Sequence, residues 1–89
     1  MLTIARSKRF EGEYRKFVKH SSKRAESIIK AVNLFIQDSK RPSLHIEKLK
    51  GNNVWSMRID RGNRIFFIWV NTSTVLFIDV GPHDKYRSY

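Results

Sequence analysis

The sequence predicts an α+β fold of the order β-α-α-β-β-β, in which a helical hairpin packs on one face of a small antiparallel sheet. Apolar residues recur at helical spacing in the first half of the chain, and three short apolar segments separated by turn residues occupy the second half. The 89 residues, 40% of them hydrophobic, can build one modest core. We therefore expect a single domain over residues 1–89.

The first half is expected to begin with a short strand at residues 2–5 and to continue with two helices. Ser7 is suited to cap the first helix, Ser21-Ser22 interrupts the apolar pattern, and the second helix must end before Pro42. A short connection between two helices predicts a hairpin. The apolar positions are Phe10, Tyr14, Phe17 and Val18 in the first helix and Ala25, Ile28, Ile29, Val32, Phe35 and Ile36 in the second.

The second half predicts a three-stranded antiparallel meander at residues 54–60, 64–70 and 75–80. An odd loop at residues 61–63, with Gly62 or Asn63 in the left-handed region, would match the core faces of the first two strands and place Arg58 and Arg64 on the same face. The expected core set is Trp55, Met57, Ile59, Ile65, Phe67, Trp69, Leu76, Ile78 and Val80.

Strand alternation collects polar residues on the sheet face away from the helices. This face is expected to carry two cations, Arg58 and Arg64, which exceed the single carboxylate Asp79. The excess favours a phosphate site, and the alternative is a cross-strand ion pair of Asp79 with one arginine. The full set on this open face is Ser56, Arg58, Arg64, Phe66, Asp79 and His83.

The segment 83–89 follows the last strand and brings together His83, Tyr86 and Arg87. Histidine can move protons near neutral pH, tyrosine can stack on a base, and arginine can hold a phosphate in a bidentate fork. These properties favour a nucleic-acid site, although a frayed, solvated C-terminus is the alternative.

The charge of the chain indicates a negatively charged partner. Eighteen Lys and Arg against eight Asp and Glu give a net charge of +10. The segment from Arg6 to Arg24 contains eight basic and two acidic residues. No cysteine, signal peptide or membrane span is present, so we expect a soluble, cytoplasmic protein. The positions of His20, His45 and His83 do not form a zinc motif, and we expect no metal or cofactor.

Four motifs in this order resemble the RelE/ParE superfamily of toxins from toxin–antitoxin systems. They are the segment 44–51 (LHIEKLKG), the segment 55–59 (WSMRI), the segment 63–65 (NRI) and the segment 80–86 (VGPHDKY). The resemblance covers essentially the whole chain. For the RelE/YoeB-like branch it implies cleavage of messenger RNA in the ribosomal decoding site without a metal. It also implies an acidic, largely helical antitoxin that holds the otherwise monomeric toxin in a hetero-oligomer.

The resemblance assigns site residues by position. In the RelE/YoeB-like branch a glutamate before the Leu-Lys-Gly motif matches Glu47, an arginine that starts the middle strand matches Arg64, and a C-terminal histidine and tyrosine match His83 and Tyr86. Other RelE-type members use lysines that match Lys48 and Lys50 and an arginine that matches Arg58. In YoeB-like proteins the histidine and tyrosine are adjacent, so Tyr89 or Arg87 could take the place of Tyr86.

Cleavage of RNA by its own 2′-hydroxyl requires a base, an acid and cations around the phosphorus. Glu47 or His83 can be the base and the other the acid. We favour Glu47 as base because Lys48 and Lys50 flank it. Two rival functions remain: inhibition of DNA gyrase, as in the ParE-like branch, and binding of RNA or the ribosome without catalysis.

Overall fold

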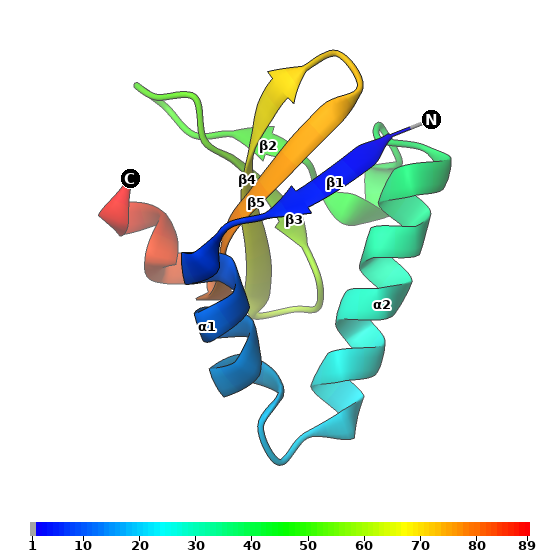
Figure 1. The fold of residues 1–89 in the computed structure, drawn as a ribbon, viewed down its shortest axis with the longest axis vertical. Coiled ribbons are helices and arrows are strands. Elements are labelled where there is room, and N and C mark those ends of the chain that lie inside the picture. The colour runs from blue at the N-terminus through cyan, green and yellow to red at the C-terminus, as the bar shows by residue number, and fades with distance from the viewer. Residues whose placement is uncertain (1) are drawn as a thin grey trace.

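Two helices lie on one side of a five-stranded sheet in the computed structural model, which describes residues 2–89 (Figure 1). The strands are arranged in the order β1-β5-β4-β3-β2. The elements along the chain are β1 (Thr3–Arg6), α1 (Lys8–Val18), α2 (Ser22–Gln37), the 3₁₀ helix η1 (Pro42–Leu44), β2 (Glu47–Lys48), β3 (Trp55–Arg58), β4 (Asn63–Asn71), β5 (Thr74–Pro82) and the 3₁₀ helix η2 (His83–Ser88).

Both helices begin where the sequence predicts. The Ser7 hydroxyl accepts a hydrogen bond from the Phe10 backbone N–H, and the Ser21 hydroxyl accepts one from the Arg24 backbone N–H. Each cap satisfies a backbone donor that has no partner inside the helix. The apolar side of each helix then packs on the sheet and forms the core with it, through Phe10 and Phe17 of α1 and Ile28, Ala31 and Phe35 of α2.

The sheet is mixed, whereas the sequence predicted an antiparallel one. Strands β2 to β5 pair antiparallel, but β1 runs parallel to β5 at the edge of the sheet. Strand β1 is joined to the other strands through two helices instead of a turn, so no hairpin sets its direction. The two-residue strand β2 was not expected from the sequence, and it forms the opposite edge.

The β3–β4 connection has the expected parity with a different turn. Arg58 lies opposite Arg64 and Met57 opposite Ile65, so the prediction that the two arginines share a face is confirmed. Neither residue proposed for the left-handed region has positive φ. Instead, the Asp60 carboxylate accepts hydrogen bonds from the Gly62 backbone N–H and the Asn63 side-chain amide, at 3.0 and 2.9 Å.

A β-bulge at Ile78 changes the predicted faces of β5. Val80 lies opposite Ile65 as expected, but beyond the bulge Phe77 lies opposite Phe67 and Val75 opposite Trp69. The extra residue moves the register by one, which reverses the alternation. The predicted core residues Leu76 and Ile78 are therefore only half-buried, while Val75 and Phe77 lie in the core.

None of the helices within residues 2–89 is long and apolar enough to cross a membrane.

Candidate active site

The centre of the candidate site is a pair of neighbouring guanidinium groups. Arg58 Nε and Arg64 Nη1 both donate to the backbone carbonyl of Asp60, at 3.4 and 3.3 Å. Arg64 also donates to the carbonyl of Asn63 at 3.0 Å. Within residues 2–89, neither arginine forms an ion pair with a carboxylate. Two fixed positive charges thus lie side by side and can both bind a phosphate oxygen.

The surroundings of Arg64 favour the binding of an anion beside this pair of guanidinium groups. Burial and the neighbouring Arg58 charge lower the pKa of Arg64, and the negative charges of Glu47 and Asp60 partly oppose that shift. Arginine remains protonated in spite of such a shift. An anion bound between the guanidinium groups would relieve the repulsion between them, which favours phosphate binding at this position.

Glu47 lies on the same face of the sheet as the two arginines. It pairs with Ser56 on β3, which in turn lies opposite Phe66 on β4. Residues opposite one another in an antiparallel pair share a face, so Glu47 stands one row away from the Arg58 and Arg64 row. Its side chain is exposed and accessible to a ligand.

The two lysines that follow Glu47, Lys48 and Lys50, lie at different places relative to this site. Lys48 is the next residue of β2 and lies opposite Trp55, so it belongs to the other face of the sheet. Lys50 is exposed in the turn after β2. The expectation that both lysines flank Glu47 at one site is therefore wrong for Lys48, because strand alternation separates the two side chains.

Asp79 does not lie on an open face, as the sequence suggested, but is fully buried beneath the C-terminal helix. Its Oδ2 accepts from Arg9 and, at 2.7 Å, from the Tyr89 hydroxyl, and its Oδ1 accepts from Lys85 at 2.8 Å and from the Val80 backbone N–H at 2.9 Å. Neither Arg58 nor Arg64 pairs with it, so the alternative of a cross-strand ion pair is wrong. These contacts tie η2 to β5 and to α1.

We call this cluster the Asp79 anchor; it consists of Arg9, Glu13, Asp79, Lys85 and Tyr89. Burial alone would raise the pKa of Asp79, but hydrogen bonds from Lys85, Tyr89 and the Val80 backbone outweigh it, so that the pKa lies below its usual value. Glu13 bonds the same Lys85 ammonium from α1. The sequence contains one signal for such a cluster: a carboxylate inside an apolar strand must find partners when it is buried.

The anchor also explains a glycine and a buried aromatic residue. A Cβ at Gly81 would lie 2.8 Å from the aliphatic chain of Lys85, so Lys85 crosses β5 where no side chain is present. The Tyr89 ring lies 5.6 Å from the ring of Phe66, which is fully buried although it lies on the face away from the main helices. Segment 83–89 is thus docked against the sheet, and the alternative of a frayed tail is wrong.

The other side of η2 presents the remaining predicted site residues. The His83 backbone N–H donates to Gly62 O in the β3–β4 turn at 2.8 Å, which holds the start of η2 beside the strand that begins with Asn63 and Arg64. The His83 and Tyr86 rings are 5.4 Å apart, and the Arg87 guanidinium lies 5.9 Å from the Tyr86 ring centre. All three side chains are exposed.

The structure separates the roles of the two C-terminal tyrosines. Tyr86 is exposed next to His83, whereas the Tyr89 hydroxyl is bound to Asp79. Burial and this hydrogen bond raise the pKa of Tyr89 to about 12. Tyr89 is therefore a structural residue, which leaves Tyr86 as the tyrosine available to a ligand. Within residues 2–89, no group of three or more His, Asp or Glu side chains is arranged to hold a metal ion.

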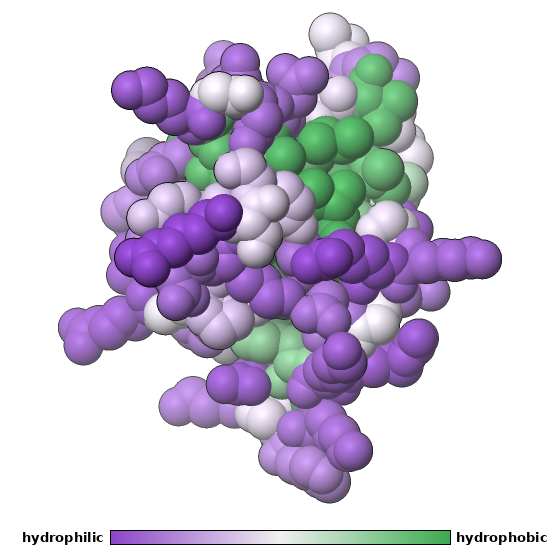
Figure 2. Space-filling view, turned by 90° about the vertical axis from the view of Figure 1, so that its left-hand side faces the viewer, coloured by the Kyte–Doolittle hydropathy of each residue, from purple (hydrophilic) through white to green (hydrophobic). Residues whose placement is uncertain are grey.

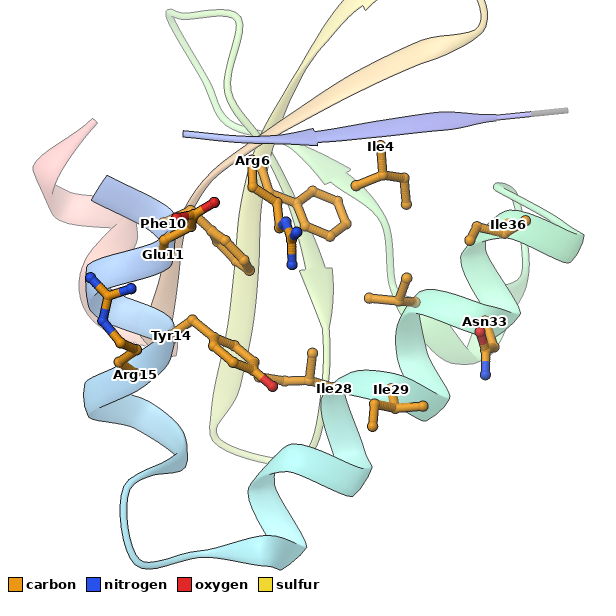
Figure 3. A pocket seen from close by; sticks show the side chains of 12 residues that line it. Ile4, Arg6, Phe10, Glu11, Tyr14, Arg15, Ile28, Ile29, Asn33 and Ile36 are labelled. Carbon is orange, nitrogen blue, oxygen red and sulfur yellow. The ribbon is translucent and has the colours of Figure 1, made fainter. Parts of the chain in front are cut away.

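A second surface lies between the two main helices. They enclose an open cavity of about 630 Å³ beneath β1, which we call the interhelix groove. Phe10 and Tyr14 point into it from α1, facing Ile28 and Ile29 of α2 (Figure 3). Ile29 remains 57% exposed. By contrast, the surface on the side of α1 and η2 is mostly hydrophilic (Figure 2).

Comparisons with known proteins identify the fold. Neither protein-family models nor curated proteins match the sequence. Among solved structures, a metal-bound toxin from Helicobacter pylori is 22% identical, with 96% of this chain and 98% of that chain covered and a TM-score of 0.76. The YafQ in the E. coli DinJ–YafQ toxin–antitoxin complex is 12% identical, with 94% of each chain covered and a TM-score of 0.74.

A third similar structure is the Staphylococcus aureus YoeB–YefM toxin–antitoxin complex, at 20% identity, with 93% of this chain and 98% of that chain covered and a TM-score of 0.73. All three structures contain toxins, and two of them are complexes of a toxin with its antitoxin. The chain therefore has the RelE-like fold, and the resemblance seen in the sequence motifs is confirmed at the level of the fold.

Proposed function

We propose that this protein is the toxin of a type II toxin–antitoxin system and that it cleaves messenger RNA on the ribosome. The observation that carries the proposal is the pair of guanidinium groups of Arg58 and Arg64, which form no ion pair with a carboxylate of the described residues 2–89. They lie on one sheet face with Glu47, close to the start of the helix that carries His83. A cationic pair between two groups able to exchange protons is suited to phosphoryl transfer.

In the proposed reaction the 2′-hydroxyl of the RNA attacks the adjacent phosphorus. Glu47 removes the proton of the 2′-hydroxyl while the new O2′–P bond forms. The P–O5′ bond breaks, and the His83 imidazolium donates its proton to the leaving 5′-oxygen. Arg58 and Arg64 stabilise the negative charge that develops on the non-bridging oxygens. The products are a 2′,3′-cyclic phosphate and a 5′-hydroxyl, and no metal is needed for this balance.

The proton roles of Glu47 and His83 can be exchanged, because both side chains are exposed and both residue types serve as general acid or base in catalysis. Tyr86 lies beside His83 and is available to stack on a nucleotide or to orient the histidine. Arg87, beside Tyr86, and Lys50, in the turn after β2, are further exposed cations suited to bind the RNA backbone or the ribosome.

The test is cleavage of a messenger RNA by the purified protein in a ribosome-containing translation extract, followed by primer extension. The fragments should carry 5′-hydroxyl ends, and a 2′-O-methyl group at the scissile nucleotide should prevent cleavage because the nucleophile is blocked. Fragments with 5′-phosphate ends would contradict the proposed chemistry. An unaffected translation reaction, together with inhibition of gyrase supercoiling, would favour the ParE-like function instead.

The proposed protein partner is an acidic antitoxin with an amphipathic helix. A net charge of +10 attracts such a partner, and the apolar interhelix groove, with Arg6 and Arg15 among its lining residues, offers it a complementary surface. Two of the similar solved structures are complexes of a toxin with its antitoxin.

The groove can be tested by co-purification with the product of a neighbouring reading frame. Ile29→Glu adds a negative charge to the groove and should weaken the complex by roughly tenfold or more, since this charge repels an acidic partner and is costly to bury in an apolar contact. Gln37→Glu makes the same charge change at an exposed position of α2 outside the groove and is the matched control. Equal binding by both variants would place the partner elsewhere.

A further inference from the structure

The two tryptophans of the chain lie together at a second cavity. Trp55 of β3 and Trp69 of β4 line an open cavity of about 460 Å³, bordered by the segment that follows α2. Both indoles are half-buried, and they belong to the face of the sheet that carries the helices. This cavity is therefore distinct from the face that carries Arg58 and Arg64.

Basic side chains lie around the two indoles. Lys40, Arg41 and His45 line the cavity, and Lys48 lies opposite Trp55 in the β2–β3 pair. All four are exposed, and across residues 2–89 none of their side chains forms an ion pair. Among the described residues, none of those that line the cavity carries a carboxylate. Its composition is thus an aromatic floor with a cationic border.

The backbone at the border is held in an unusual conformation. His45 has φ 45°, in the left-handed region that non-glycine residues rarely adopt, and its backbone N–H donates to Pro42 O at 3.1 Å. Such strain persists only where the surrounding structure maintains it, and it is common at ligand sites. Here it turns the chain after η1 so that His45 borders the cavity.

These observations narrow the class of ligand. An aromatic floor accepts a planar group by stacking, and exposed lysine and arginine side chains beside it bind phosphate. A purely apolar ligand would not use the cations, and a simple anion would not use the indoles. We propose that this cavity, formed by Lys40, Arg41, His45, Trp55 and Trp69, binds one nucleotide of single-stranded RNA.

The position of the cavity suits an RNA that also reaches the candidate active site. Strand β2 is the edge of the sheet, and its two residues belong to opposite faces, Glu47 to the catalytic face and Lys48 to the face of the cavity. An RNA strand that crosses this edge can contact both faces. The cavity thus provides a second contact for the RNA substrate. That the bound RNA is a substrate rests on the proposed function, whereas the binding of RNA at the cavity does not.

Binding at the cavity can be followed by intrinsic tryptophan fluorescence, because both tryptophans of the chain lie there. A short 2′-O-methyl RNA tetranucleotide, which cannot be cleaved by the proposed reaction, should quench this fluorescence with saturation through base stacking on indole. Quenching should weaken with added salt, as phosphate contacts do. Inorganic phosphate at the same charge concentration should not quench.

The variant Lys40→Gln/Arg41→Gln should bind the tetranucleotide roughly tenfold more weakly or worse. The matched control is Lys23→Gln/Lys30→Gln, which removes the same charge from exposed positions of α2. Its binding of the tetranucleotide should weaken by less than half of the factor found for Lys40→Gln/Arg41→Gln. Trp55→Phe keeps an aromatic floor and leaves Trp69 as the reporter, so quenching should persist. Equal loss in the two double variants, or no quenching by the parent, would overturn the proposal.

The outcome is separable from that of the proposed function. Quenching by a protein that never cleaves messenger RNA would support the cavity and refute the nuclease. Cleavage by a protein that shows no quenching would do the opposite.

Discussion

The Asp79 anchor makes a strong prediction about stability. Asp79→Asn keeps the size of the side chain but replaces one carboxylate oxygen with an NH₂ group, which is a donor. Oδ2 accepts from Arg9 and Tyr89, and Oδ1 accepts from Lys85 and the Val80 backbone. Either orientation of the amide therefore sets a donor against donors and removes the charge that compensates Lys85.

The size of the stability loss in Asp79→Asn follows from the burial of Asp79 and from the exposure of its partners. Removing one partner of a buried ion pair costs about 3–5 kcal/mol. The Arg9 side chain is 63% exposed and can return to water, and Lys85 keeps Glu13 as a partner, so the loss should be smaller. We expect the free energy of unfolding to fall by about 2–3 kcal/mol, against about 5–15 kcal/mol for a whole domain. The melting temperature should then fall by about 10–20 °C.

The assay is urea unfolding at pH 7, monitored by circular dichroism. Asp84→Asn is the matched control, since Asp84 is exposed on the same helix η2 and loses the same charge. It should change the free energy of unfolding by no more than about 0.5 kcal/mol. If Asp79→Asn is as stable as this control, Asp79 does not hold η2 on the sheet and the reasoning is refuted.

The same pair of proteins gives a pH test with a defined sign. The folded-state pKa of Asp79 lies below the unfolded value of about 3.9. The ionised form is therefore favoured by folding, and this contribution is present above about pH 4 and lost as the pH falls through the lower folded-state pKa. The stability difference between the parent and Asp79→Asn should be largest near pH 7 and should narrow below pH 4.

Three further predictions concern chemistry, binding and the C-terminal tyrosine. Arg64→Ala and His83→Gln should each slow single-turnover cleavage by roughly 10²-fold or more while binding changes little; parental rates in both would move the active site elsewhere. Lys16→Gln/Lys19→Gln should weaken binding to ribosomes in filter assays, in a salt-dependent way, and should spare cleavage at saturation. In an ultraviolet titration the folded parent should show a tyrosine step near pH 12 that is absent from Tyr89→Phe; a parent without this step would contradict the hydrogen bond to Asp79.

Local chemistry explains which parts of the fold could be predicted. Ser7 and Ser21 satisfy backbone donors a few residues away, and apolar spacing selects the buried side of each helix, so both helices follow from the sequence. The parity of the β3–β4 connection depends on a few adjacent residues, and it placed Arg58 and Arg64 on one face correctly. The sequence therefore predicted the relative placement of those candidate site residues that lie near one another in the chain.

Long-range contacts decided the rest. The bulge at Ile78 depends on the packing of β5 against β4 and the helices, and it cannot be read from the alternation within β5. Asp79 finds Arg9 about seventy residues away, and only the folded chain brings α1, β5 and η2 together around it. The sequence by itself determined the helices, the pairing of the arginines and the positive charge. The tertiary structure alone decided that Asp79, Lys85 and Tyr89 dock the C-terminal helix and leave His83 and Tyr86 exposed, because a buried carboxylate takes whichever donors the fold brings to it.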